Sequence, residues 1–140
     1  MPEYTPVASS VQKVSGVVEK EGTSGEALNA GDLIYLDAAD GDKAKKAQCD
    51  GTSTQAVVAG MVLNSAPAAG QPIKYAVLGE LAIGAAIFGG VAKVLVLGTT
   101  AGKCMDVADL LATHRLVLIG WSTGTNKLKL AISNTGLQVP

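Results

Sequence analysis

Short runs of β-branched and other apolar residues, separated by glycine-rich turns, are the feature that most constrains this chain. No stretch keeps the i, i+3, i+4, i+7 spacing of an amphipathic helix for long, so the runs predict strands rather than helices. Many short antiparallel strands joined by such turns are typical of a β-sandwich or a small β-barrel. The segments expected as strands are 11–19, 33–37, 43–48, 56–64, 73–78, 80–83, 91–97, 115–123 and 127–133.

Two hairpins stand out in this pattern. In LIYLDAADGDKAKKAQ, Asp40 and Gly41 supply the positive φ values that a tight turn between two strands requires. In LVLIGWSTGTNKLKLAI, Gly124 lies in the turn, and the strand that follows alternates between apolar residues and lysines. Such alternation predicts one buried and one solvated face. The alternating residues are Leu128, Leu130 and Ile132 on one face and Lys127 and Lys129 on the other.

The rest of the chain is organised around this β pattern. Residues 1–10 show neither the helical spacing nor the strand alternation of apolar residues, and they contain Pro2 and Pro6. This predicts an extended N-terminal arm before a single β domain over residues 11–140. A short helix is expected only at 107–113, with Asp106 as its N-cap. The small-residue segment 79–98 is expected to run strand, loop, strand.

The charge balance excludes one class of partner. The formal charge is −1, from 11 basic and 12 acidic side chains, so no strong field attracts a polyanion, and we expect no direct nucleic-acid partner. Charged residues make up 16% of the chain, below the roughly 25% of soluble globular proteins. The low charge fraction suggests that a partner covers part of the surface.

We expect no membrane partner and synthesis in the cytoplasm. The longest apolar stretch, 81–92, is interrupted by glycines and is far shorter than the roughly 20 residues of a membrane span. The first residues, MPEYTPVASS, lack a basic region followed by an apolar core, so no secretory signal is expected. The only cysteines, Cys49 and Cys104, form no CxxC pair and are expected to stay reduced.

The segment VLVLGTTAGKC is the strongest candidate for nucleotide chemistry, because it resembles a strand followed by a phosphate-binding loop. Its glycines, Gly98 and Gly102, are separated by three residues where that loop has four, and Lys103 precedes Cys104 instead of a hydroxyl residue. A turn between two β-strands is therefore the favoured interpretation.

Other chemistry-bearing residues also favour structural interpretations. His114 is the only histidine, lies outside any GxSxG turn, and is expected at the surface without a catalytic role. Four aspartates near the first hairpin depart from the calcium-loop spacing and lie close to lysines, which favours a solvated turn; they are Asp37, Asp40, Asp42 and Asp50. We therefore expect no catalytic residue, no metal, no cofactor and no enzymatic activity.

Trp121, in the strand LVLIGWST, is interpreted first as a core residue. An anchor in an interface is the alternative.

Four segments carry a resemblance to a known family: GDLIYLDAADGDKAKKA, VVAGMVLNSAPAAGQPIKYAVLGELAIG, KVLVLGTTAGKCMDVADLL and VLIGWSTGTNKLKLAI. In this order they resemble the capsid decoration, or cement, proteins of tailed bacteriophages, over about residues 30–133. The chain departs from the common pattern at KVLVLG, where the family has a tyrosine-bearing strand, and at Cys104.

The resemblance implies a β-barrel or β-sandwich, commonly trimeric, on the outer surface of the virion. Such a protein binds the major capsid protein and stabilises the head lattice against internal DNA pressure. We expect Tyr4, Pro6 and Val7 of the arm to contact the capsid. We expect Ile83, Ile87 and Phe88 of the glycine-spaced apolar run to pack between subunits of a homotrimer.

Two other functions stay open at this stage. A phage fibre or tail module could bind a host receptor or glycan, although aromatic residues are only 4% of the chain and sugar platforms need exposed rings. An enzyme would have to use Lys103 or His114.

Overall fold

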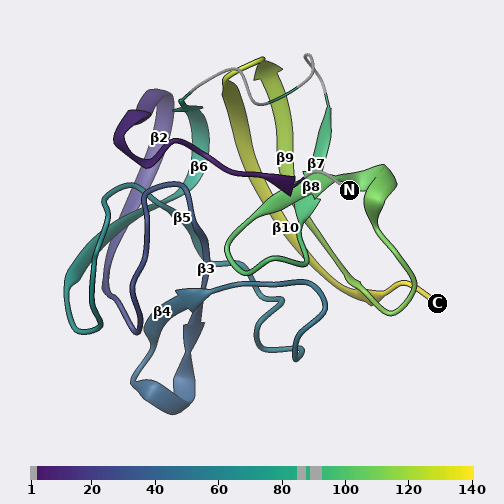
Figure 1. Ribbon diagram of the computed structural model, residues 1–140, viewed down its shortest axis with the longest axis horizontal. Helices are drawn as coiled ribbons and strands as arrows, with labels where there is room; N and C mark the ends of the chain where they lie inside the picture. The colour runs from purple at the N-terminus through teal and green to yellow at the C-terminus, as the bar shows by residue number, and fades with distance from the viewer. Residues whose placement is uncertain (1–2, 85–87, 89–92) are drawn as a thin grey trace.

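The protein is all-β, as the sequence predicts. The computed structural model describes residues 3–84, 88 and 93–140. Its strands form one antiparallel sheet that curls into a half-barrel (Figure 1). The strands are β1 (Glu3–Tyr4), β2 (Val11–Thr23), β3 (Leu33–Asp37), β4 (Lys43–Lys46), β5 (Gly60–Val62), β6 (Pro72–Ile83), β7 (Val94–Leu97), β8 (Cys104–Asp106), β9 (Arg115–Gly124) and β10 (Lys127–Gln138).

The strand order is β1-β8-β7-β9-β10-β6-β5-β3-β4, and β2 pairs with β6. β6 therefore joins the two halves of the sheet. Its first half pairs with β5, its second half pairs with β10, and β2 runs along its other edge. Gly79, in the middle of β6, has a φ of +115°, and a Cβ there would collide with the backbone of Gly16 and Val17. Only glycine lets β2 approach β6 this closely.

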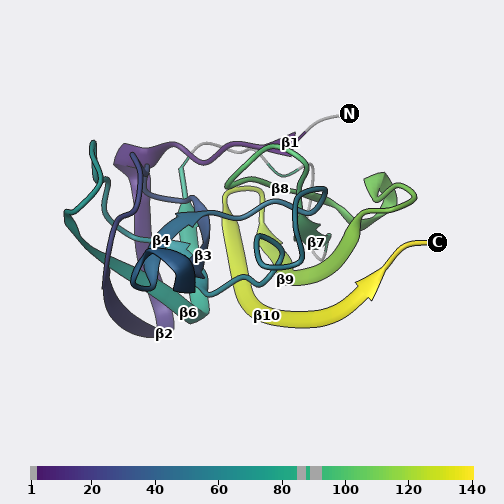
Figure 2. The ribbon, with the colours of Figure 1, turned by 90° about the horizontal axis from the view of Figure 1, so that it is seen from below.

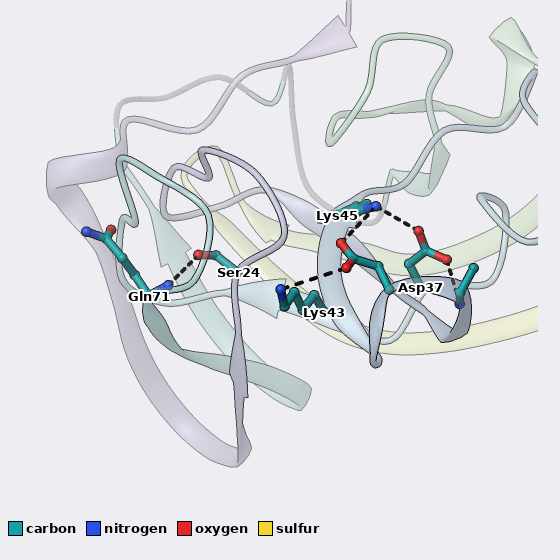
Figure 3. Close-up of polar contacts among 7 residues, drawn as sticks. Ser24, Asp37, Lys43, Lys45 and Gln71 are labelled. Atoms are coloured by element: carbon teal, nitrogen blue, oxygen red, sulfur yellow. Dashed lines mark hydrogen bonds and ion pairs between the residues drawn. The ribbon is translucent and has the colours of Figure 1, made fainter.

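Both predicted hairpins are confirmed, but the positive φ values of the first turn lie at Gly41 and Asp42, not at Asp40. β3 pairs with β4 around a 3-10 turn, η2 (Ala38–Asp40), and Gly41 follows with a φ of +65°. Lys45 bridges the hairpin by ion pairs of 2.8 Å to Asp37 and 3.3 Å to Asp40 (Figure 3). β9 pairs with β10, in which Leu128 and Leu130 are buried.

Several predicted element bounds were wrong. The two strands predicted at 73–78 and 80–83 are one strand, β6, and the strand predicted at 56–64 is only Gly60–Val62. The predicted helix at 107–113 is a single 3-10 turn, η3 (Val107–Asp109), and the Asp106 carboxylate does not cap it but binds Tyr4 and Lys93. A third 3-10 turn, η1 (Ala8–Ser10), precedes β2. Two short strands, β1 and β8, were not predicted.

The apolar core has two parts. The larger cluster includes Leu81 of β6, Leu95 of β7, Ile119 of β9 and Leu128 of β10. The smaller cluster lies beneath β3, β5 and the first half of β6, with Leu28, Ile34, Val62, Ile73 and Tyr75. Beside it, the buried Ser24 hydroxyl accepts a 3.0 Å hydrogen bond from the backbone N–H of Gln71, which ties the end of β2 to the start of β6 (Figure 3).

The N-terminal segment crosses from β2 to β8 along one side of the molecule (Figure 2). β1 pairs with β8, and the hydroxyl of Tyr4 donates a 2.9 Å hydrogen bond to Asp106. The Tyr4 ring meets Phe88 edge to face, with centroids 4.9 Å apart. Farther along, the Val7 N–H donates to the carbonyl of Ile83. The segment is thus bound to the body of the same chain.

Candidate interaction surface

The outward face of the sheet carries large apolar side chains from four strands. On β9, Trp121 pairs in register with Val94 of β7 and with Lys129 of β10. Trp121 keeps 44% of its surface exposed, and Val94 keeps 45%. These two side chains form the first part of the surface.

The second part lies across β10. Leu78 of β6 pairs in register with Ala131 of β10 on one side and with Val18 of β2 on the other. Leu78 and Val18 each keep 47% of their surface exposed. We call Val18, Leu78, Val94 and Trp121 the outer-face patch. Apolar side chains exposed as neighbours on a sheet are typical of a surface that another molecule covers.

Trp121 lies outside the core, so the first interpretation of this residue was wrong. The pairing of β9 with β7 and β10 is irregular next to Gly120, between Leu118 and the tryptophan. This irregularity breaks the alternation that buries Val117 and Ile119, and it turns Trp121 outward.

The three residues predicted to contact the capsid differ in how much of their surface is left exposed. Tyr4 is buried in the core cluster, where burial and the hydrogen bond to Asp106 raise its pKa. Pro6 is half-buried and packs close to Gly31. Val7 keeps 39% of its surface exposed, so it retains the most surface of the three for a partner.

The predicted subunit interface is also largely covered by the chain itself. Ile83 and Phe88 are buried in the core, and the Phe88 N–H donates a 2.9 Å hydrogen bond to the carbonyl of Thr125. Little of either side chain is left for a second subunit. Ile87 lies outside the described residues.

The residues weighed for catalysis have structural partners. The segment around Gly98 and Gly102 joins the antiparallel strands β7 and β8, as the favoured interpretation predicted. Lys103 in that segment forms a 3.1 Å ion pair with the buried Asp32. Both Cys49 and Cys104 are buried.

His114 is buried, so the expected surface position was wrong. Its Nδ1 accepts a 3.1 Å hydrogen bond from the Leu111 N–H, which closes the turn before β9.

The carboxylates of the first hairpin are held by lysines. The hydrogen bond from Lys45 lowers the pKa of Asp37 below its usual value of 3.8. Among residues 3–84, 88 and 93–140, no three His, Cys, Asp or Glu side chains gather closely enough to hold a metal ion.

Leu78 and Val18 were missed because β6 and β2 carry apolar residues on both faces. One signal could have identified Leu78. It shares the alternation phase of Lys74 and Glu80, both charged, whereas the opposite phase contains the buried Ile73 and Leu81. No comparable signal marks Trp121, because the irregularity beside Gly120 depends on pairing with two other strands.

No protein-family model matches the sequence, and no curated protein matches it significantly. Within the described part of the chain, no helix has the length and hydropathy to span a membrane.

Proposed function

We propose that this chain is a capsid decoration protein that binds the outer surface of a phage head and stabilises the lattice of the major capsid protein. The observation that carries the proposal is the outer-face patch, which exposes two pairs of neighbouring apolar side chains, Val94 with Trp121 and Leu78 with Val18, on either side of β10. A protein that acts by adhesion needs such a surface and needs no reactive group. The proposed protein is a homo-oligomer, a trimer, made in the host cytoplasm and located on the virion.

The resemblance to decoration proteins supports the same function. Two of the segments that carry it form the β3–β4 and β9–β10 hairpins. Many copies on a repeating lattice also gain avidity, so a patch of moderate size suffices for stable attachment.

The test is binding to empty heads assembled from the major capsid protein of the same virus. Leu78→Ser removes an exposed apolar side chain from the outer-face patch, and we expect it to weaken binding about three- to tenfold, because Leu78 keeps 47% of its surface to bury and full burial of a leucine contributes roughly 1.5–3 kcal/mol. Cosedimentation over a range of protein concentrations measures the affinity.

Leu111→Ser is the matched control. Leu111 is exposed in the turn before β9, outside the outer-face patch, so its replacement leaves head binding unchanged. Equal losses in both variants, or no cosedimentation of the original protein, would contradict the proposal.

A second candidate function is favoured by one observation. Trp121 is exposed beside Lys129, and an exposed aromatic ring is what a glycan-binding fibre or tail module requires. Trp121 is the only tryptophan, so its fluorescence reports directly on sugar binding. A saturable change on adding host-surface glycans would favour this function over head binding.

A further inference from the structure

Arg115 is the only arginine of the chain, and it forms no ion pair with any residue that the structure describes. Its backbone N–H donates a 2.9 Å hydrogen bond to the carbonyl of Cys49, which fixes the start of β9. Its Nε is shielded from solvent and has no hydrogen-bond partner among the described residues. The ion pairs found in the described part of the chain all use lysine.

The Arg115 side chain lines a pocket of about 210 Å³. Ala56, Val57 and Val117 supply apolar walls. Asn134 also lines the pocket, but its amide is occupied, because it accepts a 2.8 Å hydrogen bond from the Val58 N–H and donates a 3.1 Å bond to the Val58 carbonyl. This pair of hydrogen bonds to the backbone holds the 56–59 segment against β10, so the pocket is preformed.

Two larger grooves differ from this pocket in the polar groups that line them. Both are lined by Asn64 and Lys74, with volumes of about 450 and 430 Å³. The Asn64 side chain accepts from the Lys74 N–H and donates to the Pro72 carbonyl. In the larger groove, Lys13 forms an ion pair with Glu19. The Asn64 amide and the Lys13–Glu19 pair are therefore used within the chain, whereas the small pocket is lined by a residue whose charged group carries a shielded donor without a partner among the described residues.

The Nε–H of Arg115 is shielded from solvent without an acceptor among the described residues, and an unsatisfied donor on a charged group is costly, so an anionic acceptor in the pocket is favoured. The planar guanidinium matches a carboxylate by two parallel hydrogen bonds. The apolar walls favour an aliphatic stem on that carboxylate. At about 210 Å³ the pocket is smaller than the roughly 300–1,000 Å³ of ordinary ligand sites, so it accommodates one short group.

We propose that Arg115 and its pocket bind a carboxylate on a short aliphatic stem. Two sources share this chemistry: an acidic side chain of a partner protein, and a small free aliphatic acid. A phosphate fits less well, since it presents more oxygens than one guanidinium satisfies and has no stem for the apolar walls.

The experiment follows the Nε–Hε resonance by NMR, which is unambiguous because the chain has one arginine. The full protein is titrated at constant ionic strength with butyrate, with glutamate blocked at both its amino and its carboxyl terminus, with butyramide and with inorganic phosphate. We expect a saturable shift with butyrate and blocked glutamate, and none with butyramide. Tighter binding of blocked glutamate identifies a protein side chain as the ligand, and tighter binding of butyrate identifies a free acid.

Arg115→Lys keeps the charge but loses the planar fork, and we expect it to weaken butyrate binding about tenfold or more, as followed by backbone amide shifts of the pocket. Lys127→Gln, which removes an exposed cation on β10, is the matched control and keeps full binding. The titration of the wild-type protein tests the proposal even if the Arg115 variant does not fold. An Nε–Hε resonance that does not respond to butyrate and blocked glutamate, or responds equally to butyramide or phosphate, would overturn the proposal.

Discussion

At the scale of single residues, Tyr4 shows how far burial within the chain changes an expected role. A tyrosine in a proline-containing terminal segment suggests an exposed contact, but its ring packs on Phe88 and its hydroxyl bonds to Asp106. The aspartate also receives a 3.5 Å contact from the Lys93 ammonium. Tyr4 therefore stabilises the junction of β1, β8 and Phe88.

Tyr4→Phe is expected to lower the free energy of unfolding by about 1–2 kcal/mol at pH 7, because it removes a hydrogen bond to a charged acceptor. The pKa of Tyr4 is raised above its usual value of 10.0, mainly by burial and then by Asp106. A raised pKa means that the tyrosine stabilises the fold fully below pH 10.0, and that this contribution is lost as the pH rises through the raised value.

Urea unfolding of both proteins at pH 7 and above pH 10 measures the effect. The difference between wild type and Tyr4→Phe is expected to narrow at the higher pH. Tyr35→Phe is the control, because Tyr35 is also a largely buried tyrosine but its hydroxyl makes no hydrogen bond among the described residues. A Tyr4→Phe difference that stays constant or grows with pH would show that the hydroxyl does not act through its protonated form.

At the scale of elements, the β9–β10 hairpin depends on one glycine. Gly120 pairs with Leu130 of β10 and Leu95 of β7, and its φ is +152°. A Cβ at this position would collide with the carbonyl oxygen of Lys129. The glycine therefore permits the close strand approach that accompanies the outward turn of Trp121.

Gly120→Ala is expected to destabilise the protein by at least about 2 kcal/mol, since the strand must shift to relieve the collision. Gly124→Ala is the control, because the nearest atom to a new Cβ there is 3.8 Å away. Thermal or urea unfolding compares the two, and Trp121 fluorescence reports whether the indole moves. Equal stability of both variants would mean that the hairpin does not need glycine at position 120.

The elements also show what the sequence could and could not predict. The β3–β4 and β9–β10 hairpins were predictable because the turn chemistry at Gly41 and the alternation after Gly124 are local signals. β1 and β8 are short and exist only by pairing with each other and with β7, so no local pattern marks them. The same limit applies to the candidate site, since the outer-face patch arises from the register between strands far apart in sequence.

At the scale of the whole molecule, the curled sheet separates two surfaces. The outer-face patch spans β2, β6, β7 and β9, with β10 between its two parts. The pocket of Arg115 lies instead between the 53–57 segment, the start of β9 and the later part of β10. We propose that the first surface binds a partner by apolar contact and that the second binds one by charge.

The proposed assembly is a homotrimer. Light scattering is expected to give three times the 14.1 kDa mass of one chain, at micromolar protein concentration. Because Ile83 and Phe88 are buried within the chain, the interface between subunits must use other residues. A stable monomer under these conditions would contradict the trimer.

The location of the protein on purified virus particles tests the central claim most directly. Cryo-electron microscopy of particles from cells that produce this chain is expected to show repeated density on the outer head surface. The half-barrel should fit that density with Trp121 and Leu78 facing the capsid. Density confined to a fibre or tail, or particles that lack the chain altogether, would contradict the account.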